Sequence, residues 1–293
     1  MFEGIYTALI TPFRDDVVDE TVLRSLIDEQ AAAGVDGIVP CGSTGESATL
    51  SHAEHERVIA LAVEHSAGRL KVIAGTGSNN TAEACRLTTA AAKAGADGAL
   101  LISPYYNKPT QAGHVAHYRA VAEAAGIPIL AYNIPGRTGV NMEPETLALM
   151  SEVDGIVGVK EASGSIDHTQ RTMQLAGDDF VVLSGDDTMT LAMMAVGAKG
   201  VIGVLPNLMP VRFKELVAAA ARNDFAEARK IHRELLPLML AMGLETNPIP
   251  IKTAMAMAGK GDGAMRMPLT PMTDANTAKL RACMESYSLL ATP

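Results

Sequence analysis

Lys160 is the residue whose type and position point most directly to chemistry. It follows the apolar run Ile156-Val157-Gly158-Val159, which predicts a buried strand with the lysine amine at its carboxyl end. A lysine attacks a carbonyl group only in its neutral form, and burial lowers the pKa of the amine toward neutrality. Lys160 is therefore a candidate Schiff-base nucleophile. The alternative is a lysine that extends to solvent or pairs with an acid such as Glu161.

Two further side chains are placed to assist such an amine. Tyr132 ends the preceding predicted strand, where a phenol can transfer protons, although a core tyrosine also fits this position. Arg137 follows in a Pro-Gly-Arg-Thr-Gly turn. Its planar guanidinium suits a carboxylate, although an ordinary surface charge is an equal alternative.

Other motifs give weaker indications of function. Gly75-Thr76-Gly77 begins like a dinucleotide-binding loop but lacks the third glycine. Gly42-Ser43-Thr44-Gly45 lacks the His and Asp partners that a serine nucleophile needs. Two histidine pairs have i,i+3 spacing, which makes a poor metal site without a third ligand and favours solvent-exposed helix faces. These pairs are His52/His55 and His114/His117.

The elements that must position these residues alternate between short apolar runs and helical segments. Such runs are typical of parallel strands buried on both faces. Eight strand–helix units in one chain favour a closed (β/α)8 barrel, with the active site at the carboxyl ends of the strands. The predicted strands cover residues 4–10, 37–39, 70–74, 98–102, 128–132, 156–160, 180–183 and 200–202.

The last part of the chain follows another pattern. Residues 226–242, 251–257 and 274–290 are helical in pattern, with no strand between them. We therefore expect a catalytic barrel over residues 1–224 and a C-terminal helical region over residues 225–293.

Composition narrows the class of protein. Lys and Arg number 24 against 33 Asp and Glu, giving a formal charge of −9, which argues against nucleic acid or anionic membrane as a partner. The N-terminal stretch MFEGIYTALITPF resembles neither a signal peptide nor a membrane span. The three cysteines, Cys41, Cys85 and Cys283, suggest no disulfide framework. A cytoplasmic protein is expected.

Taken in order, several segments make this chain similar to the dihydrodipicolinate synthase family, within the pyruvate-dependent lyase superfamily, over essentially its whole length. The matching segments are Gly42-Ser43-Thr44-Gly45-Glu46-Ser47, Pro104-Tyr105-Tyr106-Asn107-Lys108-Pro109, Tyr132-Asn133-Ile134-Pro135-Gly136-Arg137-Thr138-Gly139, Gly158-Val159-Lys160-Glu161 and Asn247-Pro248-Ile249-Pro250-Ile251-Lys252.

The resemblance implies that the chain condenses pyruvate with L-aspartate 4-semialdehyde, in diaminopimelate and lysine biosynthesis, through an imine on Lys160. It implies no metal or organic cofactor, because the lysine itself supplies the electron sink. It also implies roles for individual residues. Tyr132, Ser43 and Tyr106 would form a proton relay, Thr44 would bind the pyruvate carboxylate, Arg137 would bind the second substrate, and Gly185 and Ile202 would line the pocket.

The resemblance further implies a homotetramer built as a dimer of dimers, in which Tyr106 reaches the active site of the adjacent subunit. It implies feedback inhibition by L-lysine at the subunit interface. The positions matching lysine-sensitive members are Ser47, Ala48, His52, His55, Asn79, Glu83 and Tyr105.

Two alternatives remain open at this stage. Ser43 stands where the family commonly has threonine, and a Ser-Thr pair also occurs in the N-acetylneuraminate lyase branch. Lyases of that branch, or of keto-deoxy sugar acids, are therefore a second possibility, although an arginine at position 137 favours the synthase. A non-catalytic amino-acid sensor is the third.

Overall fold

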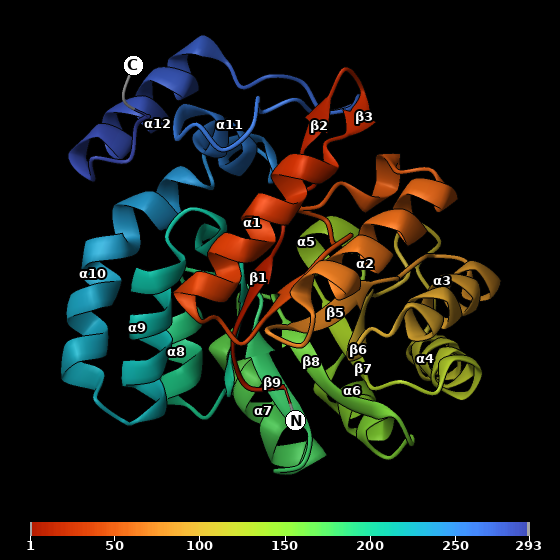
Figure 1. The fold of residues 1–293 in the computed structure, drawn as a ribbon. Coiled ribbons are helices and arrows are strands. Elements are labelled where there is room, and N and C mark those ends of the chain that lie inside the picture. Colours follow the sequence, from red (N-terminus) through yellow and green to blue (C-terminus); the bar gives the residue numbers. More distant parts are fainter. Residues whose placement is uncertain (1, 292–293) are drawn as a thin grey trace.

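The computed structural model describes residues 2–291, which form a closed barrel of eight parallel strands surrounded by helices (Figure 1). The strands follow one another around the barrel in chain order, and β1 closes it by pairing with both β4 and β10. The predicted (β/α)8 barrel is confirmed. The barrel strands are β1 (Gly4–Ala8), β4 (Gly37–Val39), β5 (Lys71–Gly75), β6 (Gly98–Ile102), β7 (Ile129–Asn133), β8 (Ile156–Glu161), β9 (Val181–Ser184) and β10 (Gly200–Gly203).

The helices cover the outside of the barrel and continue beyond it. Three of them begin with a capping side chain: Asp19, Ser51 and Asn80 each accept a hydrogen bond from a backbone amide of the first turn. The helices are α1 (Glu20–Ala33), α2 (His52–Ser66), α3 (Thr81–Ala94), α4 (Gln111–Ala125), α5 (Pro135–Thr138), α6 (Pro144–Ser151), α7 (Ile166–Ala176), α8 (Thr190–Ala195), α9 (Pro210–Ala221), α10 (Phe225–Ala241), α11 (Ile249–Met257) and α12 (Asp274–Ser286), with 3-10 turns η1 (Ser47–Thr49) and η2 (Leu205–Asn207).

Some predicted boundaries were wrong. The first strand ends at Ala8 rather than at residue 10, and the last helix ends at Ser286 rather than at residue 290. Ser288 has a φ of 55°, a left-handed conformation that does not continue a helix. A small hairpin of β2 (Phe13–Arg14) and β3 (Val17–Val18) was not predicted.

The core has an inner and an outer part. Side chains such as Tyr6, Leu130 and Ile202 fill the barrel interior. A larger cluster lies between the strands and the helices, and it includes Leu235 of α10 and Ile251 of α11. The C-terminal helices therefore share the main hydrophobic core, and α11 and α12 lie at the end of the barrel opposite the N-terminus (Figure 1). Between residues 2 and 291, no helix is long and apolar enough to span a membrane.

Candidate active site

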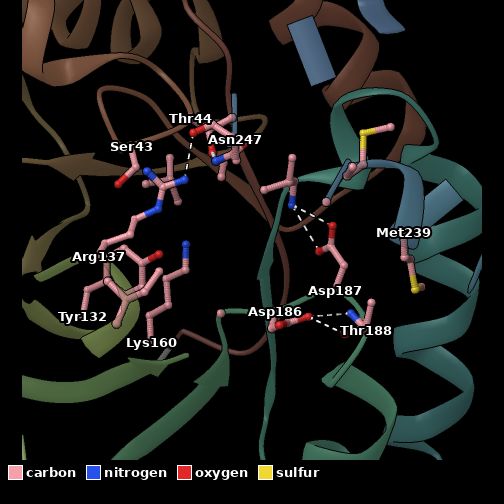
Figure 2. Close-up of a pocket in the computed structure, with 18 of the residues that line it drawn as sticks. Ser43, Thr44, Tyr132, Arg137, Lys160, Asp186, Asp187, Thr188, Met239 and Asn247 are labelled. Atoms are coloured by element: carbon pink, nitrogen blue, oxygen red, sulfur yellow. Dashed lines mark hydrogen bonds between the residues drawn. The ribbon is translucent and has the colours of Figure 1, made fainter. Parts of the chain in front are cut away.

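A cavity of about 430 Å³ opens at the carboxyl ends of the strands, where the barrel fold predicts an active site (Figure 2). Strand-end residues form one side, and α10 with the segment after it forms the other. The polar residues on its wall are Ser43, Thr44, Tyr132, Arg137, Lys160, Asp186, Asp187, Thr188 and Asn247.

Lys160 lies on the wall of this cavity with only 5% of its surface exposed. Its Nζ atom is 4.2 Å from the centre of the Tyr132 ring. Burial lowers the pKa of the amine from 10.5 to about 8; Asp187 opposes this shift, and the positive charge of Arg137 adds to it. The amine is therefore protected from solvent and more readily deprotonated than an ordinary lysine. The alternative of a lysine extended into solvent is wrong.

The position of the Lys160 side chain depends on a glycine of the neighbouring strand end. A Cβ atom at Gly185 would lie 3.1 Å from both Cγ and Cε of Lys160 and 2.8 Å from Cβ of Ala162. These separations are shorter than ordinary van der Waals contacts, so a side chain at position 185 would displace the lysine stem. Gly185 itself is fixed by a backbone hydrogen bond to Glu161.

Asp187, on the wall of the same cavity, is the acid whose charge acts on Lys160. Its carboxylate accepts backbone hydrogen bonds from Val204 and Leu205, the latter at 2.7 Å. Burial nevertheless raises the pKa of Asp187 to about 6. The acid thus fixes the chain after β10 and supplies negative charge to the site. Sequence reasoning gave it no role.

Tyr132 is paired with Lys160 across β7 and β8, so both side chains point into the barrel mouth. Burial raises the pKa of its phenol to about 12, while Arg137 opposes this shift. The hydroxyl therefore keeps its proton at neutral pH and is suited to donate it.

Asn247 connects the two sides of the cavity. Its Nδ2 atom donates to Oγ1 of Thr44 at 3.0 Å, and its carbonyl oxygen accepts from Nη2 of Arg137 at 2.8 Å. Its Oδ1 atom is buried and has no hydrogen-bond partner among the described residues. Sequence reasoning quoted Asn247 in a matching segment but gave it no function, because a loop 110 residues from Arg137 carries no local signal of such a contact.

Two expected site residues lie away from the cavity wall. Ile202 is fully buried in the barrel interior, in the cluster that contains Tyr132. Tyr106 is 88% exposed and has a φ of 71°, so its ring projects outward from the loop after β6. Within one chain, Tyr106 does not meet Lys160.

A second cavity, of about 440 Å³, lies beside the first and shares residues such as Ser43 and Arg137 with it. Six of the seven positions expected for an effector line it: Ser47, Ala48, His52, His55, Glu83 and Tyr105. The seventh, Asn79, donates a hydrogen bond to the carbonyl oxygen of Tyr105. Glu83 pairs with His52 at 2.8 Å, and the hydroxyl of Ser78 together with His52 lowers the pKa of its carboxyl group.

The expectation that both histidine pairs lie on solvent-exposed helix faces was wrong for three of the four residues. His55, His114 and His117 are buried, and only His52 is exposed. The reason is that α2 and α4 pack against neighbouring helices and strand ends, and an i,i+3 spacing does not reveal which helix face is covered. Within residues 2–291, no group of three or more His, Cys, Asp or Glu side chains is arranged to hold a metal ion.

Comparisons with known proteins find relatives that match nearly the whole chain. A sequence profile of the dihydrodipicolinate synthetase family matches residues 1–287. The 4-hydroxy-tetrahydrodipicolinate synthase of Pelobacter propionicus is 52% identical over 290 residues, which cover 99% of this chain and 100% of that protein. The crystal structure of dihydrodipicolinate synthase from Aquifex aeolicus superposes with a TM-score of 0.98 at 48% identity, covering 100% of both chains.

Two further solved structures contain small molecules. The chloride-inhibited dihydrodipicolinate synthase from Acinetobacter baumannii, complexed with pyruvate, is 38% identical with a TM-score of 0.97, covering 99% of this chain and 100% of that chain. The DHDPS from Cyanidioschyzon merolae with lysine bound is 40% identical with a TM-score of 0.95, covering 99% of both chains. From the profile match and these identities, this chain belongs to the dihydrodipicolinate synthetase family.

Proposed function

We propose that this chain condenses pyruvate with L-aspartate 4-semialdehyde to 4-hydroxy-tetrahydrodipicolinate, a step of diaminopimelate and lysine biosynthesis. The observation that carries the proposal is the buried Lys160 amine, whose pKa is lowered to about 8 and which lies 4.2 Å from the Tyr132 ring. Full-length relatives that are 4-hydroxy-tetrahydrodipicolinate synthases support the choice of reaction.

The first half of the proposed reaction attaches pyruvate to the enzyme. The neutral amine of Lys160 attacks the ketone carbon, and loss of water leaves an iminium ion. The iminium draws electrons from the neighbouring methyl group, so one methyl proton leaves and an enamine forms. Tyr132, whose phenol keeps its proton at neutral pH, donates to the departing oxygen. Thr44, held by Asn247, binds the pyruvate carboxylate.

The second half joins the substrates. The enamine carbon attacks the aldehyde carbon, forming the carbon–carbon bond, and the aldehyde oxygen takes up a proton to become a hydroxyl group. The amine of the semialdehyde then attacks the imine carbon and displaces Lys160, which closes the ring. Arg137, on the wall of the same cavity, binds the carboxylate of the semialdehyde. The electron pairs for each new bond come from the substrates and from Lys160, so we propose no cofactor.

Ser43, Tyr132 and Tyr106 complete the proposal as a proton relay. Tyr106 lies far from Lys160 within one chain and is 88% exposed in a left-handed backbone conformation. An aromatic side chain held outward in this way is suited to enter a second copy of the chain. We therefore propose a dimer as the smallest active unit, and a tetramer of two such dimers.

L-lysine is the proposed feedback inhibitor, bound in the second cavity. Glu83 offers a carboxylate for an ammonium group, and the cavity shares Ser43 and Arg137 with the first one. The lysine-bound relative from Cyanidioschyzon merolae supports this assignment. Saturating L-lysine is expected to lower the initial rate and to bind in calorimetry, and Glu83→Gln is expected to weaken both effects. If L-lysine left the wild-type rate unchanged, the proposed inhibition would be contradicted, but the proposed reaction would not.

The condensation itself is tested by covalent trapping and substrate profiling. Borohydride reduction with pyruvate is expected to add one reduced pyruvate to Lys160, measured by mass spectrometry of the peptide, and Lys160→Met is expected to abolish the adduct. Turnover of L-aspartate 4-semialdehyde is then compared with cleavage of N-acetylneuraminate and keto-deoxy sugar acids. Trapping without semialdehyde turnover would favour a sister lyase, and the absence of any adduct would refute the proposal.

A further inference from the structure

Residues 42–50 form one loop that serves both cavities. Ser43 and Thr44 lie on the wall of the first cavity, whereas Ser47, Ala48 and Thr49 lie on the wall of the second. Glu46 stands between these two groups with its carboxylate buried in the protein. The loop has little regular structure of its own beyond η1, so its shape depends on contacts with other parts of the chain.

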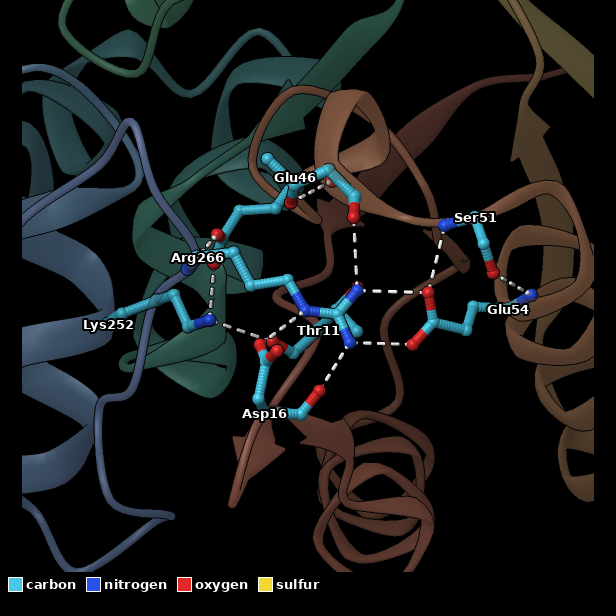
Figure 3. A network of polar contacts seen from close by, with 8 residues as sticks. Thr11, Asp16, Glu46, Ser51, Glu54, Lys252 and Arg266 are labelled. Carbon is cyan, nitrogen blue, oxygen red and sulfur yellow. Dashed lines mark hydrogen bonds and ion pairs between the residues drawn. The ribbon is translucent and has the colours of Figure 1, made fainter.

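Glu46 ties this loop to the C-terminal region. Its Oε1 atom pairs with Nζ of Lys252 in α11, and its Oε2 atom accepts the backbone N–H of Arg266 at 3.1 Å (Figure 3). Its own backbone N–H donates to the carbonyl oxygen of Ser43 at 3.2 Å. A single residue thus connects the C-terminal region with the backbone of a candidate catalytic residue.

Lys252 is as deeply buried as its partner, with 1% of its surface exposed. Its ammonium also donates to the carbonyl oxygen of Thr11 at 2.9 Å and lies 4.3 Å from the centre of the Phe13 ring. The hydroxyl of Thr11 in turn donates to the carbonyl oxygen of Gly45 at 2.7 Å. The loop is therefore held at two adjacent residues. The Thr11 hydroxyl holds Gly45, and Lys252, which also contacts Thr11, holds Glu46.

Arg266 fixes the far end of the loop. Its guanidinium donates to the carbonyl oxygen of Thr49 at 3.0 Å and to both carboxylate oxygens of Glu54, at 2.9 and 2.6 Å. Its remaining donors reach the side chain and carbonyl oxygen of Asp16. Glu54 also accepts the Ser51 backbone N–H in the capping box that begins α2. Each charged group in this network is paired. The Glu46–Lys252 pair is fully buried, whereas Glu54 is partly exposed and Asp16 is largely exposed.

A buried ion pair contributes little net stability, because desolvation of the two charges offsets their attraction. Its directional contacts do, however, restrict the loop to one shape. Five residues before Lys252 in the same C-terminal region lies Asn247, which donates to Thr44 and accepts from Arg137. Contacts from one short stretch therefore reach Thr44, Glu46 and Arg137.

We propose that Glu46, held by Lys252 and Arg266, is a positioning residue that fixes Ser43 and Thr44 against the pyruvate bound to Lys160. The inference rests on the proposed function, since it assigns Thr44 to the pyruvate carboxylate. Glu46 does not touch substrate and acts through the loop backbone. Lys160 belongs to β8 and not to the loop, so its ability to form an imine does not depend on this network.

The test uses the variant Lys252→Met and the double variant Glu46→Gln/Lys252→Met in the full-length protein. The single variant leaves a buried carboxylate without its cation and is expected to lower the unfolding temperature. The double variant removes both charges, keeps side chains of similar size and is expected to recover most of that loss. A matched control is Glu29→Gln/Lys260→Met, which removes another ion pair between the C-terminal region and α1 that lines neither cavity.

For the folded double variant, we expect the KM for pyruvate to rise about tenfold, the effect of losing one well-placed hydrogen bond, and kcat to fall by a similar factor. Borohydride with saturating pyruvate should still label Lys160 in every chain, and the control should match wild type in both constants. A purely structural role predicts the opposite: an unchanged KM, with kcat and the labelled fraction falling together. That pattern, or an equal rise of KM in the control, would overturn the inference, whereas unlabelled wild-type protein would overturn the proposed function itself.

Discussion

The pH dependence of imine formation tests the environment of Lys160 directly. Only the neutral amine attacks pyruvate, so the rate must rise with pH until the amine is fully deprotonated. With a pKa of about 8, about one amine in ten is neutral at pH 7, whereas an ordinary lysine with a pKa of 10.5 has about one in three thousand. Burial therefore raises the reactive fraction at pH 7 about 300-fold.

The assay is the initial rate of borohydride trapping at low pyruvate concentration, measured from pH 6 to 9.5 without the second substrate. Low pyruvate reports the ionisation of the free enzyme, and leaving out the semialdehyde avoids titration of its own amine. We expect the rate to rise about tenfold per pH unit below pH 7.5 and to level off above pH 8.5. Lys160→Met should remain unlabelled throughout.

A rate that still rises tenfold per unit at pH 9.5 would refute the reasoning, because it would show an amine with an ordinary, solvated pKa. A rate independent of pH would refute it as well, since the amine would then not ionise in the range that burial predicts.

Three substitutions test the remaining contacts of the site. Gly185→Ala should place a methyl group against the Lys160 stem and slow borohydride trapping about 100-fold. The control is Gly136→Ala, where a Cβ atom meets nothing within 4 Å. Equal trapping rates in the two variants would contradict the steric argument. Arg137→Met should raise the KM for the semialdehyde at least tenfold while changing that for pyruvate little, because a carboxylate loses its bidentate partner; equal rises in both constants would speak against this role. Tyr132→Phe should lower kcat about 100-fold while Lys160 can still be labelled, and a kcat within threefold of wild type would remove the phenol from the mechanism.

The sequence carries enough information to predict the barrel and the lysine buried at its mouth. The short apolar runs fix which residues lie on strands, and the carboxyl end of a barrel strand has a known position relative to its neighbours. Lys160 and Tyr132 end consecutive strands, so their meeting follows from strand order once the barrel is assumed. The register that pairs them confirms it.

Contacts made by loops and by the C-terminal region could not be predicted in this way. Asn247 and Asp187 belong to segments without periodicity, and their partners lie far away or on another strand end. The buried histidines show the same limit, because packing between helices decides which face is covered. A buried ion pair such as Glu46–Lys252 has no local signature, since the two residues are 206 positions apart.

In the proposed mechanism, imine formation and recognition of the second substrate depend on different residues of the site. The lowered pKa of Lys160 is caused first by burial, and the charge of Arg137 adds only a lesser effect. Burial depends on the barrel mouth, on Tyr132 and on the space left by Gly185, none of which contacts the second substrate in the proposed mechanism. Arg137, which lies on the wall of the same cavity and donates to the carbonyl oxygen of Asn247, is the proposed contact of the second substrate. Substitutions at Arg137 and in the chain that holds it can therefore change which aldehyde is accepted while imine formation persists. Labelling of Lys160 then identifies the chemistry, and only the second substrate identifies the reaction.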